Sequence, residues 1–290
     1  MSKGKVITLV VVGCILLAVA NVALWATLDV FNSERFGAKV AEGLQSPAAT
    51  EALAESIVDQ LLEEDLRLHP LARGAATEAV AWLLQRPVFT LIYMETATAA
   101  INIMTTSAQD VVGIDLADVI SEVGDTIVGV ISVLDEESGA SAEAALDEAL
   151  TASSESGKLA FYEKGKFPQM RQLARMSPWL ALLAGLGAVA LFVVAYKQAK
   201  DQLRALEYTG VGVMFTAGLT FLLLAPGVQA IAQNNIVNPT MQIVVSEVVS
   251  VLMRGVAIQS LLLFFIGLIV YLVYHAQTKK DEPAQASPAE

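Results

Sequence analysis

The chain has 290 residues, of which 55% are hydrophobic and only 17% charged, and its formal net charge is −12. This composition is too apolar for an ordinary soluble protein, yet it holds too many acids for a chain that lies in a membrane throughout. Residues 29–176 carry 24 acidic and 10 basic side chains, whereas the rest of the chain sums to +2. Such an acidic segment repels nucleic acid and anionic lipid, and it attracts cations or a basic partner. The simpler explanation is that the acids keep an exposed domain soluble.

The first apolar run, residues 6–28, contains no charged side chain. As a helix it would be about 35 Å long, enough to cross a hydrocarbon core of about 30 Å. It is longer than the apolar core of a cleaved signal peptide, so we expect a retained membrane anchor. Cys14 is the single cysteine and lies inside this run, where Val11–Cys14 also allows the alternative of a bacterial lipoprotein site. The domain that follows therefore has no disulfide and must be stabilised by packing.

The acidic segment begins with signals of an amphipathic helix. Ser46 and Pro47 are typical of an N-cap and a first helical position, and the pattern continues to Leu66. Its apolar residues fall on one face and its acids elsewhere, which predicts packing on a core. The apolar face is made of Leu53, Ile57, Leu61 and Leu62, and the acids are Glu51, Glu55, Asp59 and Glu63.

Two prolines divide the next part of this segment. After His69-Pro70 a second helix should run to Leu84, and after Arg86-Pro87 a third should cover residues 88–106. The third is apolar nearly all round, so we place it at the centre of the domain. The alternative of a fifth membrane span is less favoured, because Glu95 and several threonines interrupt the run and a fifth span would reverse the topology.

The remainder of the segment mixes short strands with helices. Residues 111–116 and 158–162 are predicted strands that would pair as a small ribbon. The predicted helices are 117–134, 141–150 and a short one, 168–176, that leads into the next span.

Three further uncharged runs, residues 178–196, 208–231 and 255–274, are long enough to cross a membrane. The predicted fold is therefore mostly α: a four-helix transmembrane bundle with a predominantly helical domain that contains a small two-stranded β-ribbon. Residues 241–254 continue the helical pattern ahead of the fourth span. We expect them to dock on the domain, with the membrane surface as the alternative, because the stretch lacks the basic face that lipid surfaces favour.

The basic residues near the spans predict the orientation. They are Lys3, Lys5, Lys197, Lys200, Arg204, Lys279 and Lys280. These seven lie in residues 1–5, 197–207 and 275–290, which the positive-inside rule assigns to the cytoplasm, and the connection that begins at residue 232 has no Lys or Arg until Arg254. Residues 29–176 and 232–254 would then be extracytoplasmic. The chain is thus expected to be a multi-pass protein of the cell membrane with both termini in the cytoplasm and a disordered C-terminal tail.

No residue pattern indicates catalysis, a cofactor or a metal. His69 and His275 have no second histidine or cysteine nearby to complete a zinc site, and no nucleotide or hydrolase motif is present. The acidic clusters 63–65, 115–118 and 135–137 lack the loop spacing of a calcium site and are typical of solvated helix ends and loops. The spans carry no ionisable residue at depth, which disfavours ion-coupled transport. We therefore expect no enzyme activity, no catalytic, cofactor-binding or metal-binding residue, and no cofactor.

The strand patterns Val111–Leu116 and Lys158–Tyr162, followed by a proline-led helix, are similar to those of a poorly characterised group of bacterial four-span membrane proteins with an extracytoplasmic helical domain. That resemblance implies no activity. The topology alone, a large outer domain after span one and a small outer loop between spans three and four, also resembles permeases of cell-division and MacB-type ABC systems. The 197–207 link does not have the coupling pattern usual in those permeases.

The sequence favours a non-enzymatic membrane protein whose outer domain binds a partner protein or an envelope component, as an accessory subunit of a larger complex or through self-association. Its expected partners are the lipid bilayer and a protein, not nucleic acid. The alternative is an oligomeric subunit for transport or mechanical transmission that works with a separate ATPase. A sensor is less favoured, since the cytoplasmic segments are too short for an output domain.

Overall fold

The computed structural model describes residues 2–62, 70–105, 168–234, 236 and 238–281. Nearly all of these residues are helical, and the described ranges contain no strand. The chain divides into two compact units. Unit 1 comprises residues 1–28, 173–227 and 253–290, and unit 2 comprises residues 29–172 and 228–252. Each unit is described separately below.

Within the described ranges, four helices are long and apolar enough to cross a membrane. They are α1 (Lys3–Trp25) with the π-helical turn η1 (Ala26–Val30), α8 (Pro168–Gln198), α9 (Gln202–Asn234) and α10 (Pro239–Asp281). The helix α5 (Pro87–Thr105), considered above as a fifth span, is not one of them. The chain is therefore a helical multi-pass membrane protein, as its uncharged runs predicted.

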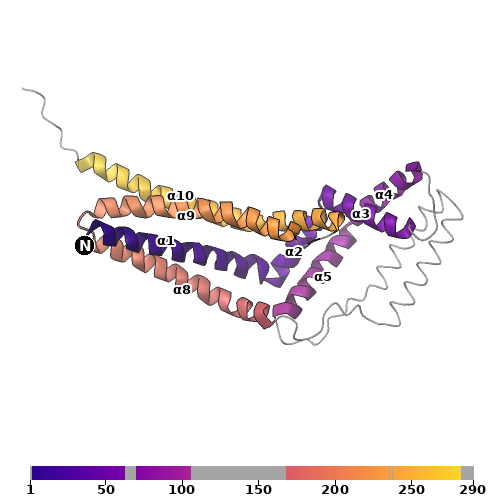
Figure 1. Cartoon of the computed structure of the whole chain (residues 1–290), viewed down its shortest axis with the longest axis horizontal. Helices are drawn as coiled ribbons and strands as arrows, with labels where there is room; N and C mark the ends of the chain where they lie inside the picture. Colours follow the sequence, from indigo (N-terminus) through magenta and orange to yellow (C-terminus); the bar gives the residue numbers. More distant parts are fainter. Residues whose placement is uncertain (1, 63–69, 106–167, 235, 237, 282–290) are drawn as a thin grey trace, which may run out of the picture. The chain divides into compact units, whose positions relative to one another are not determined.

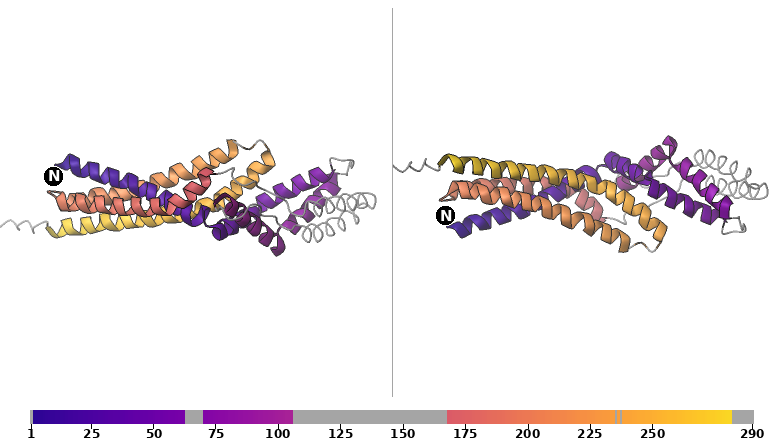
Figure 2. Two further views of the ribbon diagram at one scale, coloured as in Figure 1. Left: turned by 90° about the horizontal axis from the view of Figure 1, so that it is seen from below. Right: turned by 90° about the horizontal axis from the view of Figure 1, so that it is seen from above.

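The helices of unit 1 run side by side, as both Figure 1 and the two views of Figure 2 show. Val6 of α1 packs with Ala195 near the end of α8 and with Ala205 near the start of α9. The start of α9 in turn lies against the end of α10, because a methyl group on Gly210 would lie 2.8 Å from the backbone nitrogen of Tyr271. The start of α1, the link between α8 and α9, and the end of α10 are thus together at one end of this unit.

Small residues bring the unit 1 helices close together. Gly210 and Gly267 face each other between α9 and α10, each with the other's carbonyl oxygen 2.9 Å from where a Cβ would be. Between α1 and α9, a methyl group on Gly212 would lie 2.7 Å from the sulfur of Cys14. Close backbone approach of this kind increases van der Waals contact between membrane helices. Such contact matters there because the hydrophobic effect does not drive helices together in lipid.

Two hydrogen bonds join α1 to its neighbours in unit 1. The buried Asn21 amide donates to Ser260 Oγ of α10 at 3.3 Å. Near the end of α1, Thr27 Oγ1 donates to Ser177 Oγ of α8 at 3.0 Å. Ser177 also donates to the carbonyl oxygen of Ala174 at 3.3 Å. That carbonyl cannot receive the usual helical bond from residue 178, which is a proline and has no N–H.

Unit 2 contains α2 (Ser33–Leu44), α3 (Pro47–Leu62), α4 (Pro70–Leu84), α5, the first residues of α8, the last turns of α9 and the first turns of α10. Its main core lies between α3, α4 and α5, and consists of Ala54, Val58, Ala76, Val80, Leu84 and Phe89. Val244 of α10 packs on Ala49 and Ala52 of α3. A methyl group on Gly43 of α2 would lie 2.6 Å from the Cα atom of Val248. The stretch ahead of the fourth span therefore packs on the helices of unit 2, which was the preferred of its two alternatives.

The sequence patterns did not reveal α2. Asn32 caps its first turn, accepting from the backbone N–H of Arg35 at 3.0 Å. The helix packs along α5, where Gly37 lies against Thr98 and the carbonyl of Met94. Its Lys39 forms an ion pair of 2.9 Å with Asp29, whose side chain is only 8% exposed.

The helix α5 differs from the expectation of a helix buried on every side. Phe89, Ala97 and Ile101 are buried, but Leu91 is 55% exposed. The reason is that its packing against α2 and the α3–α4 core covers only part of its circumference. The predicted ribbon 111–116 with 158–162, and the predicted helices 117–134 and 141–150, lie outside the described residues.

Candidate functional site: an acidic groove between α3 and α4

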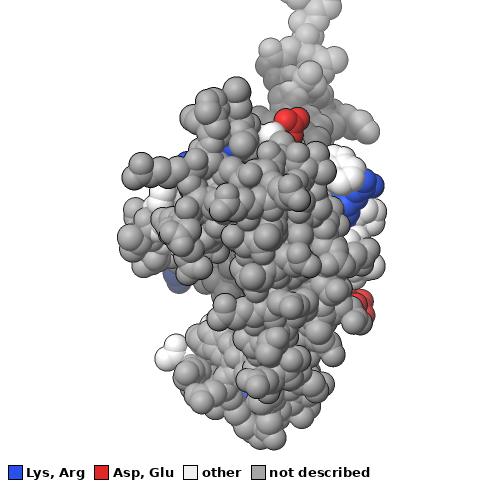
Figure 3. Space-filling model, turned by 90° about the vertical axis from the view of Figure 1, so that its right-hand side faces the viewer, with Lys and Arg blue, Asp and Glu red and all other residues white. Residues whose placement is uncertain are grey.

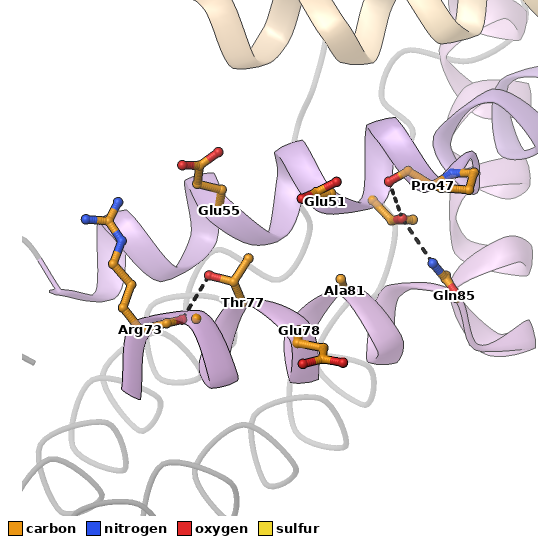
Figure 4. Close-up of a pocket in the computed structure, with 10 residues that line it drawn as sticks. Pro47, Glu51, Glu55, Arg73, Thr77, Glu78, Ala81 and Gln85 are labelled. Carbon is orange, nitrogen blue, oxygen red and sulfur yellow. Dashed lines mark hydrogen bonds between the residues drawn. The ribbon is translucent and has the colours of Figure 1, made fainter. Parts of the chain in front are cut away.

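An open groove of about 680 Å³ lies between α3 and α4 in unit 2. Its lining residues come from both helices and are drawn in Figure 4: Pro47, Thr50, Glu51, Glu55, Arg73, Gly74, Thr77, Glu78, Ala81 and Gln85. The α3 members recur every three to four residues, and so do those of α4. Each set therefore forms one stripe along its helix.

The two helices form this pair because each has an apolar stripe next to the polar one. Ala54 and Val58 of α3 face Ala76 and Val80 of α4 in the core beneath the groove. Ser46 caps α3, accepting from the backbone N–H of Ala49 at 3.2 Å, directly before Pro47 at the first helical position. The side chains above this core are small, and the groove is the space that larger side chains would occupy.

Polar contacts close the groove at both ends. At one end, the Gln85 side-chain amide donates to Thr50 Oγ1 at 3.2 Å. Thr50 is fully buried and within 3.0 Å of the carbonyl oxygens of Ser46 and Pro47. At the other end, Arg73 reaches from α4 to Asp59 of α3 and forms an ion pair with it. The groove therefore has a defined length along the two helices.

Three carboxylates surround the middle of the groove. Glu51 and Glu55 stand one turn apart on α3, and Glu78 is on α4; all three are exposed. Figure 4 shows Glu55 and Glu78 pointing away from the gap between the helices, so the acids form the rim and Thr77 with Ala81 the floor. Among the described residues, no ion pair of these glutamates is found.

The electrostatics of the groove favour a cationic ligand. Arg73 is its single basic residue and is already paired with Asp59, so the three glutamates act on whatever enters from solvent. Because they are exposed, their attraction is screened within about 8 Å at physiological ionic strength. The volume of the groove is in the range of small-molecule sites, but an open groove leaves much of a small molecule in solvent, so it suits a basic segment of another chain better.

On the face drawn in Figure 3, acidic and basic side chains of the described residues appear at separate places. Near the groove, the guanidinium of Arg86 stacks on the exposed ring of Trp82, with its carbon atom 3.6 Å from the ring centre. In α5, burial raises the pKa of Tyr93 to about 12.

Of the candidate metal-site residues that the sequence offered, the structure describes only His275. His69 and the acidic clusters 63–65, 115–118 and 135–137 lie outside the described residues. His275 is on α10, stacked on Tyr271 with ring centres 6.5 Å apart. In the described part of the chain, no group of three or more His, Cys, Asp or Glu side chains is arranged to hold a metal ion. The expectation of no catalytic, cofactor or metal residue remains a prediction.

Sequence reasoning placed Glu51 and Glu55 on the polar face of α3, but it did not find the groove. The signal was present in α4, where Arg73, Thr77, Ala81 and Gln85 repeat every four residues with small or polar side chains. That stripe indicates a helix face packed loosely beside another polar face. The sequence pattern of α4 does not predict that α3 is the helix packed beside this stripe.

No family model matches the chain, and no curated protein or solved structure matches it.

Proposed function

We propose that this is a non-enzymatic protein of the cell membrane whose unit 2 lies outside the cytoplasm and binds a basic segment of a partner protein. The orientation part of the proposal is supported by unit 1. The start of α1, the α8–α9 link and the end of α10, which lie together, hold seven basic residues near the spans, whereas three others, Arg171, Arg175 and Arg254, precede spans two and four. The positive-inside rule assigns such an end to the cytoplasm.

The observation that carries the binding part is the groove between α3 and α4. It is long, open and rimmed by Glu51, Glu55 and Glu78. A partner that places lysine or arginine side chains there would bind faster at low salt, because exposed charges steer association. The protein could serve in this way as an accessory subunit of a larger membrane complex.

Cysteine labelling tests the orientation. In a Cys14→Ala background, single cysteines replace exposed Ala38 of α2 or exposed Gln202 at the start of α9. In intact cells a membrane-impermeant maleimide should label position 38, and it should label position 202 only after the cells are permeabilised. The reverse result would overturn the orientation.

Site-specific crosslinking tests the binding. A photoreactive residue at Thr77, on the groove floor, should capture a partner through a Lys- or Arg-rich segment, whereas one at exposed Glu95 of α5 should not. Capture should fall in Glu51→Gln/Glu55→Gln and persist in the matched pair Glu34→Gln/Glu95→Gln, which removes two exposed acids elsewhere in unit 2. Equal loss in both pairs, or capture through an acidic segment, would contradict the proposal.

A second candidate is a subunit for transport or mechanical transmission that works with a separate ATPase. It is favoured by α9 and α10, which each contribute residues to both units. An ATP-dependent change in the labelling of position 38 would support it over the first candidate.

A further inference from the structure

A second groove, in unit 1, lies on the apolar surface between α1 and α9 and has a volume of about 640 Å³. Its walls are aliphatic or aromatic, and its floor is made of small or hydroxyl-bearing residues. The lining includes Ile7, Cys14 and Ala18 of α1, and Glu207, Gly212 and Thr220 of α9. We propose that this groove holds one acyl chain of an amine-bearing phospholipid, such as phosphatidylethanolamine, with its headgroup at Glu207.

The shape of the groove follows from how closely α1 and α9 approach. A methyl group on Gly212 would lie 2.7 Å from the sulfur of Cys14 and 3.4 Å from a methyl carbon of Val10, so the helices meet at the floor. Exposed side chains on either side, including Val11 and Phe215, rise above this contact. The result is a furrow rather than the convex surface that a membrane helix usually presents to lipid.

The length of the groove matches one leaflet. It extends from Glu207 to Thr220 on α9 and from Ile7 to Ala18 on α1. At 1.5 Å per residue these stretches are about 20 Å and about 17 Å long. Half of a hydrocarbon core of about 30 Å is about 15 Å, so a single lipid tail fits, whereas a membrane-spanning helix would extend well beyond the groove.

The polar end of the groove defines the headgroup. Glu207 is the one charged residue of the lining, and it lies at the end of unit 1 where α9 begins. The hydroxyl of Tyr274 of α10 lies close to its carboxylate. The basic residues at this end of unit 1 attract the phosphate that every phospholipid carries, so the carboxylate of Glu207 is the group that distinguishes an ammonium from a glycerol headgroup, and a charge-assisted hydrogen bond to the ammonium is stronger than a neutral one. This selects a phospholipid with a primary amine over one with a glycerol headgroup.

Photocrosslinking with defined lipids tests the proposal on the full chain in bilayers. The probes are phosphatidylethanolamine and phosphatidylglycerol that carry the same diazirine-bearing tail. The amine lipid should label peptides around Cys14–Ala18 and Val211–Phe215 several-fold more than the lipid-facing residues of α8, and several-fold more than the glycerol lipid does.

Two variants with matched controls separate the tail from the headgroup. Ala18→Leu fills the groove and should reduce labelling several-fold, whereas Ala190→Leu, at an exposed alanine of α8, should not. Glu207→Gln should remove the preference for the amine lipid, whereas Asp201→Asn, at the cap of α9 outside the lining, should keep it.

The wild-type chain alone can overturn the proposal, whether or not the variants fold. Labelling of α1 and α9 no stronger than that of α8 would identify ordinary boundary lipid. A crosslink between two chains through Cys14 would show that a second copy covers the groove. Equal labelling by the two lipids would remove the role of Glu207.

Discussion

The two units are both assemblies of helices, yet they place their large apolar side chains in opposite ways. In unit 1, Leu183, Phe215 and Leu222 are between 63% and 68% exposed. In unit 2, Val58, Val80 and Phe89 are at most 7% exposed, while the rim of the α3–α4 groove is made of exposed acids. A lipid solvent for unit 1 and an aqueous one for unit 2 account for this difference.

The comparison shows what holds each unit together. Burial of apolar surface stabilises unit 2 by about 25 cal/mol per Å² removed from water. It contributes little between the helices of unit 1, because lipid tails are as apolar as leucine. Close contacts at Gly210, Gly212 and Gly267 and the bond between Asn21 and Ser260 must do more there. The following substitutions test this division.

The largest effect is expected at the buried ion pair of unit 2. Lys39→Met should leave Asp29 buried without its cation and cost about 3 kcal/mol of unfolding free energy. Denaturant unfolding followed by Trp82 fluorescence, in a chain with Trp25 and Trp179 replaced by Phe, measures this. The double variant Asp29→Leu/Lys39→Met should recover most of the loss. If Lys39→Met unfolds at the same denaturant concentration as the wild-type chain, solvent must reach Asp29 freely.

The next effect is expected at Gly43, also in unit 2. In Gly43→Ala the new methyl group would meet the Cα atom of Val248, and overpacking of this kind costs about 1–3 kcal/mol. Gly74→Ala is the matched control, because no atom lies within 4 Å of its new methyl group. There the helical preference of alanine should stabilise α4 by up to about 1 kcal/mol. Both are read from the same unfolding transition; equal shifts would contradict the packing described for α2 and α10.

The corresponding test in unit 1 is Gly210→Ala. Its methyl group would lie 2.9 Å from the carbonyl oxygen of Gly267, so α9 and α10 must move apart. We expect a loss of about 1–2 kcal/mol in an unfolding titration with dodecyl sulfate in mixed micelles. Gly218→Ala, with open space at its methyl group, should leave the midpoint nearly unchanged.

A smaller effect is expected at Asn21. Asn21→Leu removes the bond to Ser260, and such bonds between membrane helices average about 0.6 kcal/mol, with about 1.7 as an upper value. The dodecyl sulfate titration detects the loss, and the double-mutant cycle with Ser260→Ala isolates the pair. A coupling energy of zero would mean that the two groups do not interact in the bilayer.

The last effect is absent at neutral pH and is confined to alkaline pH in unit 2. Burial raises the pKa of Tyr93 from 10.0 to about 12, so the folded state keeps a proton that the unfolded state loses. Its contribution to stability is fully present below pH 10 and is lost as pH rises toward 12. Tyr93→Phe should reduce the alkaline decline in the unfolding midpoint. An unchanged decline would mean that other groups cause it.

The sequence predicted the membrane part of the fold well, because four uncharged runs of adequate length leave few alternatives. It missed α2, where Gly37, Ala41 and Gly43 supply the packing face: small residues carry a weak apolar signal, and the cap at Asn32 was the better indication. The groove between α3 and α4 could not be predicted, since it depends on how two helices pair. The predicted ribbon remains a prediction.

Pro178 has a consequence for how α8 can move. A proline inside a helix usually permits bending, because one backbone bond is missing. Here the Ser177 hydroxyl replaces that bond and also lies 3.0 Å from the hydroxyl of Thr27 in η1, which is shared with the carbonyl oxygen of Ala23. Bending of α8 at Pro178 would therefore strain its contact with η1, so we expect this part of α8 and the end of the first span to move together.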